Sequence, residues 1–187
     1  VVERSMYRDS TDHVWSAGDS GAGVTALATT WHLAEGATGT FFDTFVLIAN
    51  PNDAAAEIEA RFRRGDGVIV TKAYTVAPRS RFTIWVDAAD PALAATDVAT
   101  TIVSTNGVGV FVERAMWWPG PEDAAALGTA VWSEAHASAA SPVTASRWAL
   151  ADGEQGGPGN ADTYVLIANT SAVAGTVQVT LGFDDGT

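Results

Sequence analysis

The chain has 187 residues, enough for one large or two small domains, and combines 47% hydrophobic residues and 18 glycines with only 17% charged residues. This composition is typical of a globular β-rich protein and argues against a disordered chain. A net charge of −12 argues against nucleic acid as a partner, and the absence of cysteine excludes disulfides, thiolate zinc sites and thiol chemistry. No apolar run approaches the ~20 residues that span a bilayer, so we expect no membrane insertion.

The first segment, residues 1–30, is expected to contain a strand that closes a preceding repeat, followed by a connection rich in Gly, Ser, Asp and Thr. The strand is expected because residues 2–7 (VERSMY) recur as residues 112–117 (VERAMW). The chain opens on Val1 and not on Met, so we expect it to be part of a longer protein.

Residues 41–52 (FFDTFVLIANPN) organise the rest of the chain. An apolar run that ends in an Asn-Pro-Asn breaker indicates a buried strand entering a turn. The strand returns as residues 162–169 (DTYVLIAN), which differ from residues 43–50 only by Tyr164 in place of Phe45. A strand that recurs at domain-sized spacing predicts tandem copies of one module.

Residues 31–118 are expected to form one complete module. Apolar and charged residues alternate over residues 56–63 (AEIEARFR), which predicts a strand with one buried and one wet face. A Gly-Asp-Gly turn leads into a β-branched and aromatic run at residues 68–76, and a further short strand is expected at residues 82–86.

The strongest local signal in this module is Asn106-Gly107, which lies between apolar runs at residues 98–105 and 108–118. This dipeptide is typical of a type I′ hairpin, because it tolerates a positive φ at both positions. About seven short strands result, and they predict an all-β fold: an immunoglobulin-like antiparallel β-sandwich.

Residues 119–147 are expected to be a connection, and residues 148–187 the first strands of a following repeat. The chain would then hold one complete and two partial copies of the sandwich, with differences in spacing between copies absorbed by loops.

Three motifs together resemble the uncharacterised tandem repeats found toward the C-termini of large secreted or surface bacterial proteins. These are the opening at residues 31–36 (WHLAEG), the strand ending in Asn-Pro-Asn, and the closing strand at residues 112–117. The second copy departs from the pattern, with ALADG at residues 149–153 and no proline after Asn169. The resemblance implies an extracellular, non-enzymatic setting and supplies no ligand or site residue.

Glu113 and Arg114 are the most conspicuous charged residues in an apolar strand. Neighbours on a strand point to opposite faces, so the two side chains cannot pair with each other. One of them should face inward, where an opposite charge is needed. We favour a structural role, with Arg114 bound to carbonyls or to a carboxylate of residues 31–36, over binding or catalysis.

The chain contains seven tryptophans. Trp31 and Trp148 fall at matched places in the two copies, which favours a packing role. Trp85, Trp117 and Trp118 are the candidates for an exposed platform that stacks against sugar rings.

No residue pattern predicts catalysis, so we expect no enzyme and no cofactor. The histidines lack metal-ligand spacing and no Ser/His/Asp order stands out; they are His13, His32 and His136. Calcium is an open alternative, because hard oxygen ligands suit loops of β-sandwiches. The candidate carboxylates are Asp43, Asp87, Asp90 and Asp97.

The sequence thus predicts a non-catalytic structural or adhesive module of a secreted or cell-surface bacterial protein. Its expected partners are neighbouring repeats or other copies of the chain. The unpaired edges of the partial copies could be covered by a longer chain, by closure within one chain, or by strand addition between chains into a filament. The alternative function is a carbohydrate-binding module attached to a secreted enzyme, with a surface polysaccharide as its partner.

Overall fold

The computed structural model describes residues 1–8, 17–119, 134–158 and 160–184; His13 and residues 120–133 of the expected connection at 119–147 lie outside the described residues. The strands are β1 (Glu3–Arg8), β2 (Ala17–Ala22), β3 (Thr30–Leu33), β4 (Asp43–Asn50), β5 (Ala56–Arg64), β6 (Ile69–Val76), β7 (Ser80–Trp85), β8 (Val98–Ser104), β9 (Phe111–Trp118) and β10 (Glu134–Ala139). Two short helices follow β7, α1 (Val86–Ala89) and η1 (Pro91–Leu93). Within the described ranges, no helix has the length and apolar character needed to cross a membrane.

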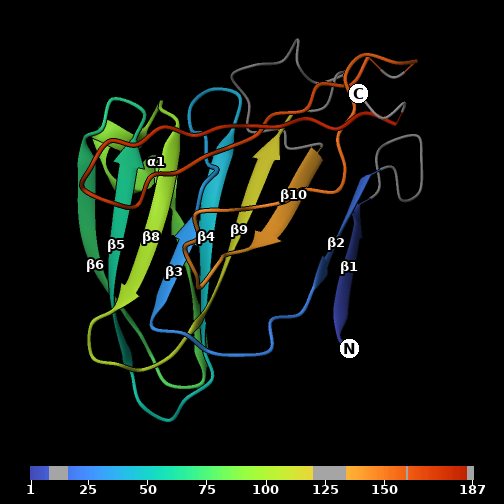
Figure 1. The fold of residues 1–187 in the computed structure, drawn as a ribbon. Coiled ribbons are helices and arrows are strands. Elements are labelled where there is room, and N and C mark those ends of the chain that lie inside the picture. The colour runs from blue at the N-terminus through green and yellow to red at the C-terminus, as the bar shows by residue number, and fades with distance from the viewer. Residues whose placement is uncertain (9–16, 120–133, 159, 185–187) are drawn as a thin grey trace.

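Two four-stranded antiparallel sheets form the body of the fold (Figure 1). One has the order β10-β9-β4-β7 and the other the order β3-β8-β5-β6. The predicted all-β antiparallel sandwich is confirmed. The consecutive strands β8 and β9 lie in different sheets, whereas β9 and β10, the last two strands of the sandwich, pair within one sheet. The immunoglobulin-like label applies to the two-sheet architecture only.

The core lies between the two sheets and follows from the period-two alternation of the strands. In β5 the side chains of Ile58 and Phe62 are buried, while the charged residues between them face outward. The largest fully buried side chains are Trp31, Phe62, Ile48, Leu93, Ile102 and Val46. They come from both sheets and from η1, so the sandwich closes over one continuous hydrophobic cluster.

The predicted hairpin at Asn106-Gly107 is wrong. The flanking strands β8 and β9 do not pair with each other; the segment carries the chain from one sheet to the other. Only Gly107 has a positive φ (+78°) in this dipeptide, so the turn is not type I′. Asn106 acts instead through its side chain, which donates to Ala55 O (2.9 Å) and accepts from Glu57 N (3.2 Å).

Replacing Gly107 by valine is still expected to destabilise the fold, by more than about 1 kcal/mol, because a β-branched residue resists a positive φ. No atom lies within 4 Å of the position that a Cβ would occupy, so the expected loss comes from backbone strain alone. The control is Gly65→Val, where space is equally open and φ is not positive. Urea unfolding of the two variants measures the difference, and equal losses would contradict the strain argument.

The β1–β2 hairpin reproduces the β9–β10 pair. Met6 lies opposite Asp19 as Met116 lies opposite His136, with offsets of 116 − 6 = 110 and 136 − 19 = 117. The hydrogen bond that follows also recurs, from Gly23 N to Val2 O (2.7 Å) and from Ala140 N to Val112 O (3.0 Å). The strands β1 and β2 therefore have the local structure of β9 and β10, the last two strands of the sandwich. The complete sandwich extends past Trp118, because β10 belongs to its sheet.

Residues 162–169 were expected to form a strand, and this expectation is not met: they are unpaired, as are residues 177–183. The reason lies in their partners, since the matching strand β4 pairs with β7 and β9, and no equivalents of those strands occur between residues 170 and 184. Local hydrogen bonds recur nevertheless. Asn169 Nδ2 donates to Val173 O (2.7 Å) as Asn50 Nδ2 donates to Ala54 O (2.8 Å).

Candidate functional site

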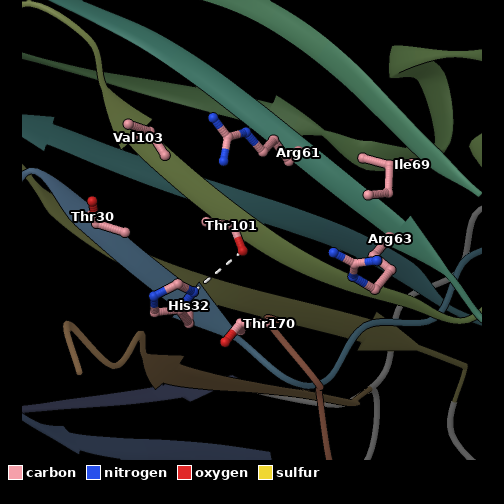
Figure 2. Close-up of a pocket in the computed structure, with 8 residues that line it drawn as sticks. All are labelled: Thr30, His32, Arg61, Arg63, Ile69, Thr101, Val103 and Thr170. Carbon is pink, nitrogen blue, oxygen red and sulfur yellow. Dashed lines mark hydrogen bonds between the residues drawn. The ribbon is translucent and has the colours of Figure 1, made fainter. Parts of the chain in front are cut away.

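A groove of about 300 Å³ lies on the outer face of the β3-β8-β5-β6 sheet, the face turned away from the core (Figure 2). Its floor is set by strand register: His32 on β3 lies opposite Thr101 on β8, which lies opposite Arg61 on β5. Arg63 follows two residues along β5 and so points to the same face. Thr170 from the C-terminal segment forms part of the wall.

The groove is polar and carries positive charge in a strongly acidic chain. Arg61 is paired with Glu59 on its own strand (2.5 Å), while no ion pair of Arg63 occurs among the described residues. The His32 Nδ1 lies 3.3 Å from the Thr101 hydroxyl, and burial lowers the pKa of His32. The arrangement offers cationic and hydroxyl groups to a ligand.

A second polar cluster lies at the inner side of the other sheet. The Arg114 side chain is 6% exposed, and its Nη1 lies 2.6 Å from Glu35 Oε2. It also donates to the Glu35 carbonyl (3.2 Å), and its Nη2 lies 2.7 Å from His136 Nε2. Arg114 thus contacts the segment at residues 31–36 that was expected from the sequence. Its structural role remains a prediction.

Glu113 points the opposite way, as the strand alternation requires. It accepts a hydrogen bond from Arg4 Nη1 (2.6 Å), and Arg4 also lies 3.7 Å from Asp19. Glu113 therefore joins the β1–β2 hairpin to the sheet that contains β9.

Acid is expected to destabilise the fold through Glu35. The neighbouring His136, whose Nε2 lies 3.5 Å from Glu35 Oε2, and the charge of Arg114 hold the pKa of this carboxyl below its ordinary value, against the opposing effect of burial. A lowered folded-state pKa stabilises the fold above the unfolded-state value, and this stability is lost as the pH falls through the folded-state value.

The measurement is the free energy of unfolding between pH 7 and pH 3 for the wild type and for Glu35→Gln. The variant should lose less stability than the wild type across this window. Burial raises the pKa of Asp87 above its ordinary value, so this group changes stability in the opposite direction as the pH falls. The contribution of Asp87 is the same in both proteins and cancels in the comparison. Parallel curves would contradict the assignment to Glu35.

Two of the three tryptophans predicted as a platform share one face. Trp85 is 47% exposed, stacks on Phe45 at 6.0 Å between ring centroids, and donates from Nε1 to Asp43 (2.8 Å). Trp117 lies opposite Asp43 in the register of β4 and β9. Trp118 points to the other face, where it donates to Glu134 (2.7 Å) and packs against His136. A ligand-binding role of all three stays a prediction.

The carboxylates of three of the four aspartates considered for calcium, Asp43, Asp87 and Asp90, bond to other groups of the fold, whereas Asp97 is described only in a backbone bridge. Asp87 accepts from Gly39 N and Thr44 N, both at 3.1 Å. Asp90 caps η1 and lies 2.6 Å from Lys72 Nζ, and Asp97 forms an isolated bridge with Ala37. In the part of the chain that the structure describes, no three His, Asp or Glu side chains gather as metal ligands.

The groove and the buried cluster contain residues that sequence reasoning missed, chiefly Glu35 and the row formed by His32, Thr101 and Arg61. One signal was present: the alternation in β5 places Arg61 and Arg63 on a common outward face. The positions of His32 and Thr101 beside Arg61 depend on pairing between strands that are far apart in sequence, and the residue pattern of a single strand does not predict that pairing.

No model of a protein family matches the chain, and no curated protein matches it in sequence. Among solved structures, the chain is similar to the crystal structure of Thermotoga maritima 1070, with a TM-score of 0.51, 14% identity and coverage of 63% of this chain and 96% of that one. It also matches the Anabaena sensory rhodopsin transducer, with a TM-score of 0.42, 23% identity and coverage of 49% of this chain and 91% of that one. The first likeness shows a shared fold and nothing about function.

Proposed function

We propose that the chain is a non-catalytic structural or adhesive module from a linear array of repeats in a secreted or cell-surface bacterial protein. The observation that carries this proposal is the equal register of β1–β2 and β9–β10. A closing hairpin that precedes a complete sandwich is what successive repeats of one module would produce.

The contacts of the hairpin support an ordered junction between repeats. β2 lies beside β10, and Arg4 reaches across to Glu113. In this arrangement each sandwich would receive the closing hairpin of the one before it. The resemblance to repeats of large bacterial surface proteins supports the extracellular setting.

Filament formation by strand addition is part of the same proposal, and the edges β6 and β7 are the available acceptors. The strand β1 already pairs with β2, so donation of β1 to another molecule requires that hairpin to open. Light scattering of the chain without residues 1–8 tests this route: an unchanged assembly state rules out donation by β1.

A carbohydrate-binding module remains the second candidate, and the placement of Trp85 and Trp117 on either side of Asp43 favours it. The indole face can stack on a sugar ring, and the carboxylate beside it can accept hydrogen bonds from the hydroxyl groups of that sugar. Fluorescence titration with neutral oligosaccharides tests this candidate. A saturable change in tryptophan fluorescence that occurs in the wild type and is absent from Trp85→Ala would support the carbohydrate-binding role.

The array is tested on a chain in which Thr187 is replaced by a second copy of residues 68–141, which supplies the strands equivalent to β6–β10. Small-angle scattering should show two sandwiches joined in series, with a maximum dimension clearly above that of the original chain. A compact particle, or one folded and one unfolded half, would contradict the proposal.

A further inference from the structure

We propose that the groove on the outer face of β3, β8 and β5 binds a small anionic polyol, a sugar-sized unit that carries a carboxylate or a phosphate. This site is separate from the tryptophan face, which lies on the other sheet, and its residues on β3, β8 and β5 do not depend on the array role. A volume of about 300 Å³ falls at the lower end of the range for small-molecule sites.

Register places the polar groups within reach of one ligand. His32, Thr101 and Arg61 lie opposite one another on three adjacent strands, and adjacent strands are about 4.8 Å apart, so the row spans roughly 10 Å. Arg63 lies beside this row on the same face, and Thr170 faces it from the C-terminal segment (Figure 2).

The charge of Arg63 points to an anion. Among the described residues, six lysine and arginine side chains have a carboxylate within 4.0 Å, namely Arg4, Arg61, Arg64, Lys72, Arg79 and Arg114. Within the same part of the chain, Arg81 and Arg147 have none and are exposed to solvent. Arg63 has none among the described residues, although it is half-buried and the chain carries a net charge of −12. A half-buried cation without a counter-charge is unfavourable, and a bound carboxylate or phosphate would pair with the planar guanidinium through two hydrogen bonds.

The neutral groups point to a polyol rather than a bare ion. Thr30, Thr101 and Thr170 each bring a hydroxyl to the groove, and His32 brings an imidazole. A hydroxyl donates and accepts, so this set matches the vicinal hydroxyls of a sugar. The contact between His32 and Thr101 is long at 3.3 Å, which leaves both groups able to exchange it for a ligand.

The test is a calorimetric titration of the full chain with glucuronate, glucose 6-phosphate and glucose at one fixed salt concentration. We expect at least one of the two anions to bind about tenfold more tightly than glucose, because a charge-assisted bidentate pair is lost with the neutral sugar. The comparison of glucuronate with glucose 6-phosphate identifies the carboxylate or the phosphate as the preferred group.

The decisive variant is Arg63→Gln, expected to weaken binding of the preferred anion about tenfold. Its matched control is Arg81→Gln, because Arg81 is an exposed arginine on the other sheet with a single bond to Thr83 (3.2 Å). Thr101→Val is a second, uncharged variant in the groove and should also weaken binding. Unfolding curves verify that each variant is folded.

Three results would overturn the proposal. The first is that glucose binds as tightly as both anions. The second is that neither anion binds at millimolar concentration. The third is that Arg63→Gln and Arg81→Gln bind the preferred anion equally well and Thr101→Val does not weaken its binding. Binding that is lost only on Trp85→Ala would assign the ligand to the aromatic face instead and would equally overturn this site.

Discussion

Replacing Trp31 by alanine is expected to lower the free energy of unfolding by about 3–5 kcal/mol, the usual cost of removing a fully buried large aromatic side chain. Trp31 is 0% exposed. Its Nε1 donates to Val110 O (2.9 Å) and Ala28 O (3.2 Å), so it ties β3 to the segment before β9. The substitution leaves a cavity and two carbonyls that lose a donor, and the two losses act in the same direction.

The sequence offers a matched control, because Trp148 falls at the position that the proposed repeat matches to Trp31. Trp148 makes the corresponding bond to Ala145 O (3.1 Å) but is 67% exposed. Trp148→Ala should therefore change stability by no more than about 0.5 kcal/mol. Chemical denaturation of both variants measures the difference. Similar losses would mean that residues 148–184 are packed against the sandwich as firmly as β3.

Replacing Arg114 by methionine is expected to cost about 3 kcal/mol. Removal of one member of a buried ion pair costs about 3–5 kcal/mol, and the lower end applies because the Glu35 side chain keeps 30% exposure and can be hydrated. Methionine retains the apolar stem of arginine, so the loss reports the guanidinium and its bonds to Glu35 and His136 rather than a cavity.

Arg4→Met is the control for this variant, since Arg4 is the repeat counterpart of Arg114 and its side chain is 37% exposed. Its pair with Glu113 is a surface salt bridge and should contribute at most about 1 kcal/mol. The double variant of Arg114 and Glu35 to methionine should be more stable than Arg114→Met alone, because no unpaired carboxylate remains. A double variant less stable than the single one would contradict the ion-pair account.

Much of the fold could be predicted because strand alternation depends only on neighbouring residues. The two faces of β5 and the opposite directions of Glu113 and Arg114 follow from period two alone. Where a feature depends on distant residues, local signals failed. Asn106-Gly107 looked like a hairpin, but β8 finds its partners in β3 and β5 and β9 finds its partners in β4 and β10.

The pair formed by residues 43–50 and 162–169 shows the same limit. The two segments differ at a single position, yet one is the central strand β4 and the other is unpaired chain. A strand is stabilised mainly by pairing and packing with its neighbouring strands, and intrinsic β propensity contributes less than those contacts. The opposite failure occurred at β10, whose Glu-Ala-His-Ala-Ser-Ala sequence has little β propensity but pairs with β9 along its own full length.

The candidate site was harder to predict for the same reason. The alternation of β5 alone places Arg61 and Arg63 on one face. Thr101 and His32 lie beside Arg61 only because β5 pairs with β8 and β8 pairs with β3. The contact of Arg114 with residues 31–36 could be anticipated because a buried charge requires a partner. The identity of that partner, Glu35, depended on the packing of the two sheets.

The central claim is that the chain contains repeats of one sandwich, and amide hydrogen exchange at residues 162–169 tests it most directly. In the original chain these amides should exchange rapidly, because they are unpaired. In the chain extended by residues 68–141, these amides gain equivalents of β7 and β9 as partners and should become as protected as those of residues 43–50. Continued rapid exchange in the extended chain would contradict the repeat.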